Sequence, residues 1–319
     1  MGTYINIGNA GFQRVRNSEY VDKSGLISIV NGTLFTERSF SCVSRSRRFG
    51  KSVAAKMLCA YYDQSCDSRS LFTDLEIASD PSFEKHLNKY PVIYLDLTSF
   101  IADRSDDNIV NKMDVALRAD IGKAYPDIPG EEGDRLMDYL LRVVEVTVQP
   151  FIFIIDEWDA ICREYAPGTQ AMDRYVGWLR RMFKSQEAAR VFAGVYMTGI
   201  LPIKKYKTES GLNNFIEYSM VEPRRMASYF GFTKDEVRML VERHRMDFDE
   251  LEKWYDGYQI GDEHSIFNPN SVMQAIDAAI AQIKRRQYPA KVAQYADNLL
   301  LVGITYNTTS KQHECRIER

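Results

Sequence analysis

A Gly-Lys-Ser tripeptide, preceded by two arginines and a phenylalanine, is the part of this sequence best suited to binding a polyphosphate. The segment fits the P-loop template G-x-x-x-x-G-K-[ST] at Gly50, Lys51 and Ser52, but Arg45 occupies the position of the first glycine. In such a loop the glycine allows close approach of the backbone, the lysine reaches the β- and γ-phosphates, and the hydroxyl ligates Mg²⁺. We therefore expect Gly50, Lys51 and Ser52 to bind ATP and Mg²⁺. The missing first glycine leaves one alternative, a helix start that contains the tripeptide by chance.

Two consecutive carboxylates further along the chain supply the second chemical signal. Asp156 and Glu157 directly follow the apolar run from Phe151 to Ile155, which is typical of a strand buried on both faces. A strand with this ending matches the Walker B motif, in which Asp156 would hold Mg²⁺ directly or through water. Glu157 would orient and polarise the attacking water. Either signal is weak alone, but the two in this order predict a site for ATP.

Thr198 is a third candidate, because it lies near the end of the strand-like run from Arg190 to Gly199. P-loop ATPases of this class place a polar sensor of the γ-phosphate at that position, and we expect Thr198 to take this role. The alternative is a threonine that bonds only its own backbone.

Arg47, Arg48 and Phe49 lie inside the loop and, with Arg45, belong to the predicted nucleotide contacts. The guanidiniums of Arg47 and Arg48 are able to pair with phosphate oxygens in bidentate fashion. The sequence leaves open an equal alternative, ion pairing with the carboxylates Asp156, Glu157 and Asp159.

The elements that must position these residues follow the alternating pattern of a parallel α/β sheet. Apolar runs predict strands over residues 39–44, 91–97, 151–155 and 190–199. Amphipathic stretches predict helices over residues 51–62, about 107–123, 133–148 and about 171–187. In the first of these helices, one face at helical spacing is formed by Val53, Met57, Ala60 and Tyr61.

The chain changes character near residue 220, where short helical stretches replace the alternating pattern. Residues 234–245 and 247–255 are the clearest of them, and a basic helix and a β-like run follow. We therefore expect an α/β protein with the three-layer parallel sheet of a P-loop NTPase, a small helical subdomain and a short C-terminal α/β tail. The expected boundaries are 1–219 for the ATPase core, 220–276 for the helical lid and 277–319 for the tail.

Composition is that of a folded protein without a strong electrostatic preference. Apolar residues make up 45% and charged residues 27%, and the net charge of −3 provides no global positive field to recruit nucleic acid. No run approaches the ~18 apolar residues that span a bilayer, and the start of the chain lacks the features of a signal peptide. The cysteines are scattered without a C-x-x-C pair, which indicates neither a disulfide framework nor a zinc site. These features favour a cytoplasmic protein without a membrane partner.

Several segments that occur in a fixed order resemble the bacterial AAA-ATPase-like family. The segments are residues 20–24, 44–52, 154–159, 198–199, 212–214, 254–258 and 267–269. The resemblance covers roughly residues 5–275, and Arg45 in place of the glycine is a trait of that family. It implies that Tyr20, Asp22 and Lys23 lie close to the nucleotide.

The tail resembles only the end of the nuclease-like PD-(D/E)XK domain into which members of that family usually continue. Residues 281–288 resemble its closing helix and residues 298–318 its final hairpin. The metal-binding aspartate and the E-x-K pair are missing, so the chain looks internally deleted and we expect no nuclease activity. Weak contact with a nucleic-acid backbone stays open through Lys284, Arg285 and Arg286. The favoured alternative is a tail that covers an apolar face of the helical subdomain through Ile280, Ile283, Leu300 and Val302.

Together these features predict Mg²⁺-dependent ATP hydrolysis that drives a conformational change. The alternative is a nucleotide-gated binding module that holds ATP with little or no turnover. The sequence identifies no protein partner and leaves self-association open.

Overall fold

The computed structural model divides the chain into two compact units. Unit 1 comprises Met1–Arg47 and Lys51–Pro223, and unit 2 comprises Arg48–Gly50 and Arg224–Arg319. The residues that the structure describes are 2–101, 108–203, 212–244, 246, 248–254, 257–261, 263–285, 301–307 and 312–318.

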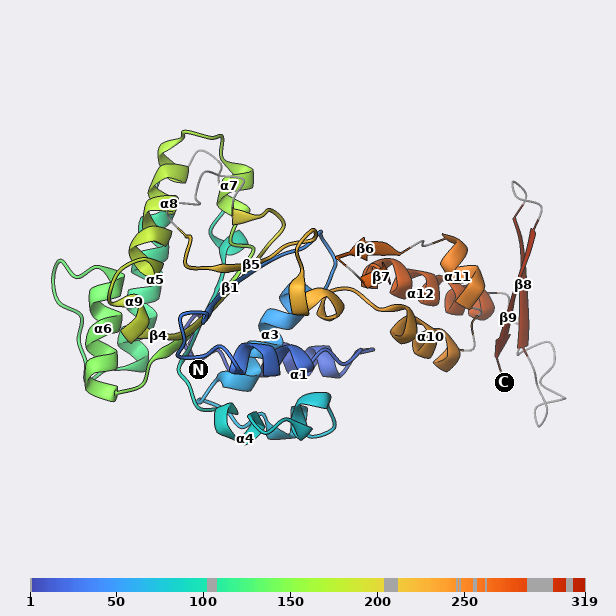
Figure 1. Cartoon of the computed structure of the whole chain (residues 1–319), viewed down its shortest axis with the longest axis horizontal. Coiled ribbons are helices and arrows are strands. Elements are labelled where there is room, and N and C mark those ends of the chain that lie inside the picture. The colour runs from blue at the N-terminus through green and yellow to red at the C-terminus, as the bar shows by residue number, and fades with distance from the viewer. Residues whose placement is uncertain are drawn as a thin grey trace. The chain divides into compact units, whose positions relative to one another are not determined.

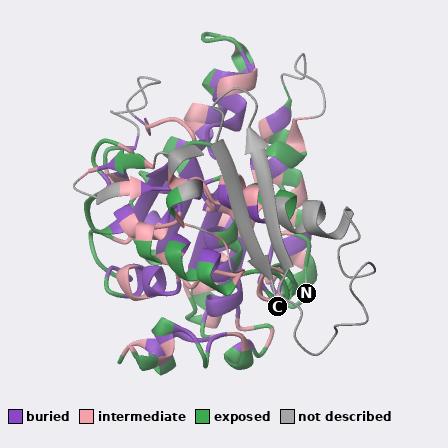
Figure 2. Ribbon diagram, turned by 90° about the vertical axis from the view of Figure 1, so that its right-hand side faces the viewer, coloured by how far each residue is buried: buried purple, intermediate pink, exposed green. Residues whose placement is uncertain are grey.

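Unit 1 is built on a five-stranded parallel sheet. Its strands are β1 (Phe40–Ser44), β2 (Val92–Asp96), β3 (Phe151–Asp156), β4 (Phe192–Gly199) and β5 (Ile216–Tyr218). Their order across the sheet is β2-β3-β4-β1-β5, and every neighbouring pair is parallel (Figure 1). All residues of β1, β3 and β4 are buried, as the purple centre of Figure 2 shows. Strands covered on both faces need such continuous apolar runs.

Helices cover both faces of this sheet, so unit 1 has three layers (Figure 1). The α-helices of its described part are α1 (Ala10–Arg16), α2 (Gly25–Asn31), α3 (Lys51–Tyr62), α4 (Phe83–His86), α5 (Ile109–Ala124), α6 (Leu136–Thr147), α7 (Ala160–Glu164), α8 (Gln170–Phe183) and α9 (Ala188–Val191). On β3, Phe151, Phe153 and Ile155 share one core cluster with residues of α5, α6 and α8. Helix α3 packs on β3 and β4 and is covered in turn by α1.

The sheet and its two helical layers confirm the predicted fold class, and α3 has the predicted bounds. Two local predictions were wrong. The helix predicted over residues 171–187 ends at Phe183, because polar residues 184–187 interrupt the apolar spacing, and α9 occupies the predicted start of β4. Val53 is 36% exposed, whereas the small residues Ala54 and Ala55 face the interior. Small side chains allow a helix to lie close to a sheet.

Unit 2 contains both helices predicted for the helical subdomain, α10 (Lys234–Arg243) and α11 (Phe248–Trp254). Helix α10 begins with a capping box, which consists of two reciprocal hydrogen bonds. Glu236 N donates a hydrogen bond to Thr233 Oγ1 at 3.3 Å, and Thr233 N donates one to Glu236 Oε2 at 2.7 Å. A hairpin of β6 (Tyr258–Ile260) and β7 (Glu263–Ile266) follows, which the helical pattern of this region does not predict.

The end of unit 2 contains a long helix and a second hairpin. Helix α12 (Pro269–Arg285) runs through the boundary predicted at residues 276 and 277, and its proline suits the first position of a helix. Strands β8 (Leu301–Asn307) and β9 (Gln312–Glu318) are antiparallel, which confirms the predicted hairpin. Outside the described part lie Arg286, Leu300 and the side chains of Ile280, Ile283, Lys284, Arg285 and Val302. None of the described helices is both long and apolar enough to cross a bilayer.

Candidate nucleotide-binding site

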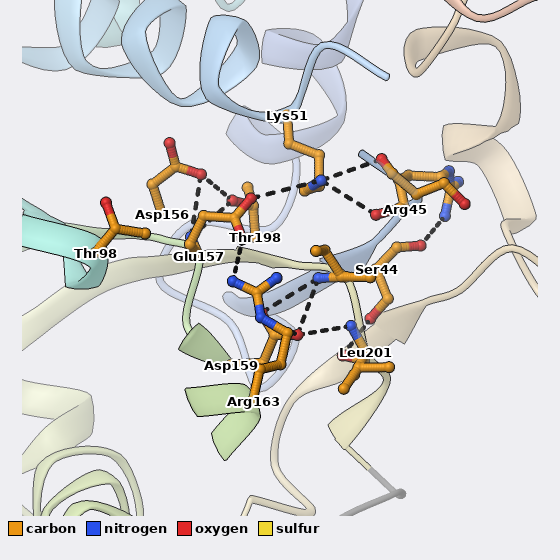
Figure 3. Close-up of polar contacts among 12 residues, drawn as sticks. Ser44, Arg45, Lys51, Thr98, Asp156, Glu157, Asp159, Arg163, Thr198 and Leu201 are labelled. Carbon is orange, nitrogen blue, oxygen red and sulfur yellow. Dashed lines mark hydrogen bonds and ion pairs between the residues drawn. The ribbon is translucent and has the colours of Figure 1, made fainter. Parts of the chain in front are cut away.

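The predicted P-loop connects β1 to α3 at the carboxyl edge of the sheet, where β3 and β4 also end (Figure 3). Gly50 has a φ of +85°, and nothing lies within 4 Å of the position that a Cβ would take. The backbone conformation, rather than a lack of space, therefore requires glycine there. Lys51 begins α3, so the first N–H groups of the helix border the loop, an arrangement that binds anions.

Arg45, which replaces the first glycine of the template, lies beneath the loop and is fully buried. Its Nη1 donates to the carbonyl oxygens of Ser44 at 2.9 Å and Tyr218 at 2.7 Å. Its backbone N–H donates to Gly199 O at 3.0 Å. Burial lowers the pKa of Arg45 to about 10. These contacts join β1 to β5 and β4, so the structure gives Arg45 a scaffolding position, and its predicted contact with nucleotide stays a prediction.

Lys51 is buried, and its ammonium group lies among oxygen atoms of the loop and of the Walker B turn (Figure 3). Its Nζ donates to Arg45 O at 3.1 Å and to Ser46 O at 3.2 Å, and it lies 3.7 Å from Glu157 Oε1. Burial lowers the pKa of Lys51, and the carboxylates of Glu157 and Asp156 oppose that shift. The sheet thus brings the P-loop lysine to the predicted base.

Asp156 is the meeting point of three predicted site residues. It ends β3, is 2% exposed, and its Oδ1 accepts from Thr198 Oγ1 at 2.5 Å. The Ser52 hydroxyl also lies close enough to this carboxylate to lower its pKa. Burial raises the pKa of Asp156, and the hydrogen bonds from Thr198 and Ser52 oppose that effect. The contact between Asp156 and Thr198 arises because β3 and β4 are neighbours in the sheet.

Glu157 starts the turn that follows β3 and has a φ of +52°. Its side chain is 20% exposed, and its Oε2 accepts from Arg163 Nη2 at 2.7 Å, while Oε1 faces Lys51. The backbone that follows Glu157 is held in place because Trp158 N donates a hydrogen bond to Thr198 O at 2.8 Å. Glu157 is therefore held between two cations at the edge of the site.

Arg163 and Asp159 complete this group, and neither has a predicted catalytic role. Asp159 is fully buried, and its Oδ2 accepts from Leu201 N at 2.9 Å and Ile200 N at 3.2 Å. Burial raises the pKa of Asp159, and the nearby charge of Arg163 opposes that shift. The spacing of four residues between Asp159 and Arg163 is the one signal in the sequence that indicates their pairing.

Tyr20, Asp22 and the backbone of Lys23 form hydrogen bonds outside the P-loop. Tyr20 Oη lies 3.4 Å from Met57 Sδ on α3 and accepts from Lys23 N at 3.3 Å. Asp22 accepts from Ser24 N at 2.8 Å and Glu76 N at 2.7 Å. These bonds fasten the segment to α3 and to residues near Glu76. The predicted proximity to nucleotide therefore stays a proposal.

The tip of the loop, Arg48–Gly50, belongs to unit 2. Phe49 is buried there, with its ring 5.4 Å from that of Tyr258 and its carbonyl oxygen accepting from Gly231 N at 3.1 Å. Arg47 and Arg48 are exposed, and Arg48 has a φ of +68°. Phe49 thus anchors the loop through its side chain. For Arg47 and Arg48, pairing with phosphate and ion pairing with carboxylates both stay open.

Comparisons with known proteins found several partial similarities. The chain is 24% identical over 278 residues to a protein of Azotobacter chroococcum mcd 1 described as "Uncharacterized protein in vnfD 5'region". The match covers 83% of this chain and 50% of that protein, so the chain spans about half the length of this curated relative. Among solved structures, the Aeropyrum pernix ORC2 protein has a TM-score of 0.44 at 12% identity, over 85% of this chain and 68% of the other. DnaA of Aquifex aeolicus has a TM-score of 0.35 at 9% identity, over 89% of this chain and 69% of DnaA.

A sequence model of one family matches more than half of the chain. The match extends over residues 6–208 and so includes the P-loop, strand β3 and Thr198. Its description is "Predicted AAA-ATPase". This chain therefore belongs to the predicted AAA-ATPase family.

Proposed function

We propose that this protein binds ATP with Mg²⁺ at the P-loop and hydrolyses it to drive a conformational change. One observation carries the proposal. Thr198 donates a hydrogen bond to Asp156, and Ser52, which is far from both in the sequence, lies close to the same carboxylate at one edge of the sheet. Lys51 lies 3.7 Å from Glu157. The groups proposed to bind phosphate, to hold Mg²⁺ and to orient water therefore lie close together, which supports the proposal.

The binding step uses Lys51 and the start of α3. The lysine Nζ would exchange the carbonyl oxygens of Arg45 and Ser46 for phosphate oxygens, which carry more negative charge. The residues present suit Mg²⁺, because this ion takes one or two carboxylates together with oxygens of substrate and water. Ser52 and Asp156 would hold it, and the ion would neutralise charge on the β- and γ-phosphates.

The hydrolytic step belongs to Glu157. A water oxygen attacks the γ-phosphorus, the bond to the β–γ bridging oxygen breaks, and ADP leaves with that oxygen. The water oxygen stays on the released phosphate, and the water proton passes to Glu157 and then to solvent. Thr198 and Lys51 would stabilise charge on the transferring group.

One observation favours a second candidate, a nucleotide-gated binding module with little turnover. Glu157 is held by Arg163 at 2.7 Å, an arrangement that limits its use as a base. Calorimetry with ATP and Mg²⁺, followed by assay of phosphate release, separates the candidates. Steady release of phosphate identifies an ATPase, and tight binding without release identifies the binding module. If ATP does not bind, both candidates are wrong.

A further inference from the structure

We propose that Arg163 is a positioning residue that restrains Glu157 and frees it by moving to Asp159. The inference rests on the proposed ATPase function and adds a control over the turnover of that same site. Arg163 lies on α7, the short helix that directly follows the Walker B turn.

Arg163 lies between two carboxylates at unequal distances (Figure 3). Its Nη2 is 2.7 Å from Glu157 Oε2, and its Nε is 3.8 Å from Asp159 Oδ2. The first distance is that of a charge-assisted hydrogen bond, and the second is too long for one. A movement of about 1 Å would bring the second pair within hydrogen-bond range. The side chain therefore has two acceptors within reach of a small shift.

The pairing with Glu157 leaves part of the guanidinium unsatisfied. The Arg163 side chain is 16% exposed, and within the described residues its Nε and Nη1 have no hydrogen-bond partner. Buried donors without partners cost free energy, so a second arrangement that satisfies Nε competes with the first. Asp159, which is fully buried and charged opposite to Arg163, supplies the acceptor for that second arrangement.

The restraint acts on the atom that the reaction needs. Glu157 has one oxygen facing Lys51 and the other bonded to Arg163. Phosphate would draw Lys51 away from Oε1, but Arg163 would still hold Oε2. A carboxylate oxygen that accepts a hydrogen bond from a guanidinium is already occupied and is not free to orient a water molecule. Turnover therefore depends on the release of Arg163.

Asp159 connects this release to the strand that carries the sensor. Its carboxylate accepts the N–H groups of Ile200 and Leu201, which follow the end of β4 directly. Thr198, near that end, bonds Asp156 at 2.5 Å. A shift of the β4 end on contact with the γ-phosphate would move the oxygens of Asp159 and thereby draw Arg163 from Glu157.

The test compares steady-state ATP hydrolysis by the full chain and its variants. Arg163→Gln should raise kcat about fivefold, equivalent to ~1 kcal/mol, and leave KM for ATP within about twofold. Arg163→Lys, which retains a positive charge, should return kcat toward the parental value. Asp159→Asn keeps an acceptor oxygen but weakens the alternative partner, so it should lower kcat. The matched control is Arg190→Gln, since Arg190 forms an exposed ion pair with Glu145 at 3.0 Å, and both constants should stay unchanged.

The outcomes separate this inference from the function on which it rests. If the parental protein hydrolyses ATP and Arg163→Gln has an equal or lower kcat, the proposed restraint is wrong and the proposed ATPase function is not affected. A parental protein that binds ATP without turnover, with turnover appearing in Arg163→Gln, supports it. A parental protein that does not bind ATP overturns the proposed function as well. Arg163→Met, which retains the apolar stem, replaces the glutamine variant if that variant does not fold. If neither folds, Arg163 is a structural residue and the proposal is wrong.

Discussion

Lys51 and Glu157 show how the charged side chains of the site stabilise one another. The lysine lies among two carbonyl oxygens and one carboxylate, although burial by itself disfavours its charge. Glu157 is correspondingly placed between Lys51 and Arg163. Each group therefore has a local partner that a ligand must displace, and the effect of removing each group can be measured separately.

Lys51→Ala should weaken ATP binding at least tenfold, a loss of ~1.4 kcal/mol or more, because no other lysine begins α3 next to the loop. Titration calorimetry with ATP and Mg²⁺ measures the change. Lys56→Ala, at an exposed position of the same helix, is the control and should bind as the parent does. Equal affinity of the Lys51 variant and the parent would mean that the P-loop assignment is wrong.

Glu157→Gln should leave ATP affinity close to the parental value but lower kcat by about a hundredfold or more, as expected for loss of a general base. The amide keeps the size of the side chain and removes its charge. Binding and phosphate release measured on the same preparation distinguish the two effects. Glu145→Gln, on the exposed side of α6, is the control. Parental turnover in the Glu157 variant would show that another residue orients the water.

The elements of unit 1 place the site at the common edge of three parallel strands. Arg45 illustrates how the ends of these strands are held, because its side chain binds carbonyl oxygens of Ser44 and Tyr218 and its N–H binds that of Gly199. An arginine at a position where the template has glycine thus joins β1, β4 and β5. Restoring the template glycine would remove the side-chain bonds to Ser44 and Tyr218 and keep the backbone bond to Gly199.

Arg45→Gly should lower the free energy of unfolding by about 2–4 kcal/mol, because buried carbonyl groups lose charged donors and a large side chain is deleted. ATP affinity should not increase, although the sequence would then match the P-loop template more closely. Chemical denaturation measures the stability. Arg47→Gly, at an exposed position of the same loop, should change it by no more than about 1 kcal/mol. A variant as stable as the parent, with tighter ATP binding, would contradict the scaffolding position of Arg45.

At the scale of the whole molecule, the chain passes between its two units at the P-loop itself. Residues 48–50 belong to unit 2, although the strand before them and the helix after them belong to unit 1. Phe49 is the buried anchor in unit 2, through Tyr258 and Gly231. The contacts of Phe49 therefore belong to unit 2, whereas Lys51 and Ser52 belong to unit 1.

The chain as given should not cut nucleic acid. A nuclease of the PD-(D/E)XK type needs carboxylates that hold Mg²⁺ and a lysine near the attacking water, and residues 270–319 contain no E-x-K. Incubation with single- and double-stranded DNA and RNA, in Mg²⁺ and in Mn²⁺, should leave the substrates intact. Metal-dependent cleavage that persists through a further purification step, and that the Glu157→Gln variant retains, would reveal a nuclease site elsewhere in the chain.

Elements with local signals could be predicted from the residues that form them. Continuous apolar runs predicted β1 to β4, and the tripeptide of residues 50–52 predicted where α3 begins, because burial on both faces and a helix start each depend on neighbouring residues. The short strand β5 and the hairpin of β6 and β7 were not predicted, because such short segments show too little periodicity.

Which of these residues contact one another depends on how the elements pack. The strand order β2-β3-β4-β1-β5 joins Ser52, Asp156 and Thr198, and it buries Arg45 beneath the loop. The pairing of Arg163 with Glu157 likewise depends on a left-handed turn at Glu157 and on the packing of α7. Spacing along the chain does not encode such contacts, because they arise from packing between segments that are distant in sequence or from a backbone conformation that the residue type does not reveal.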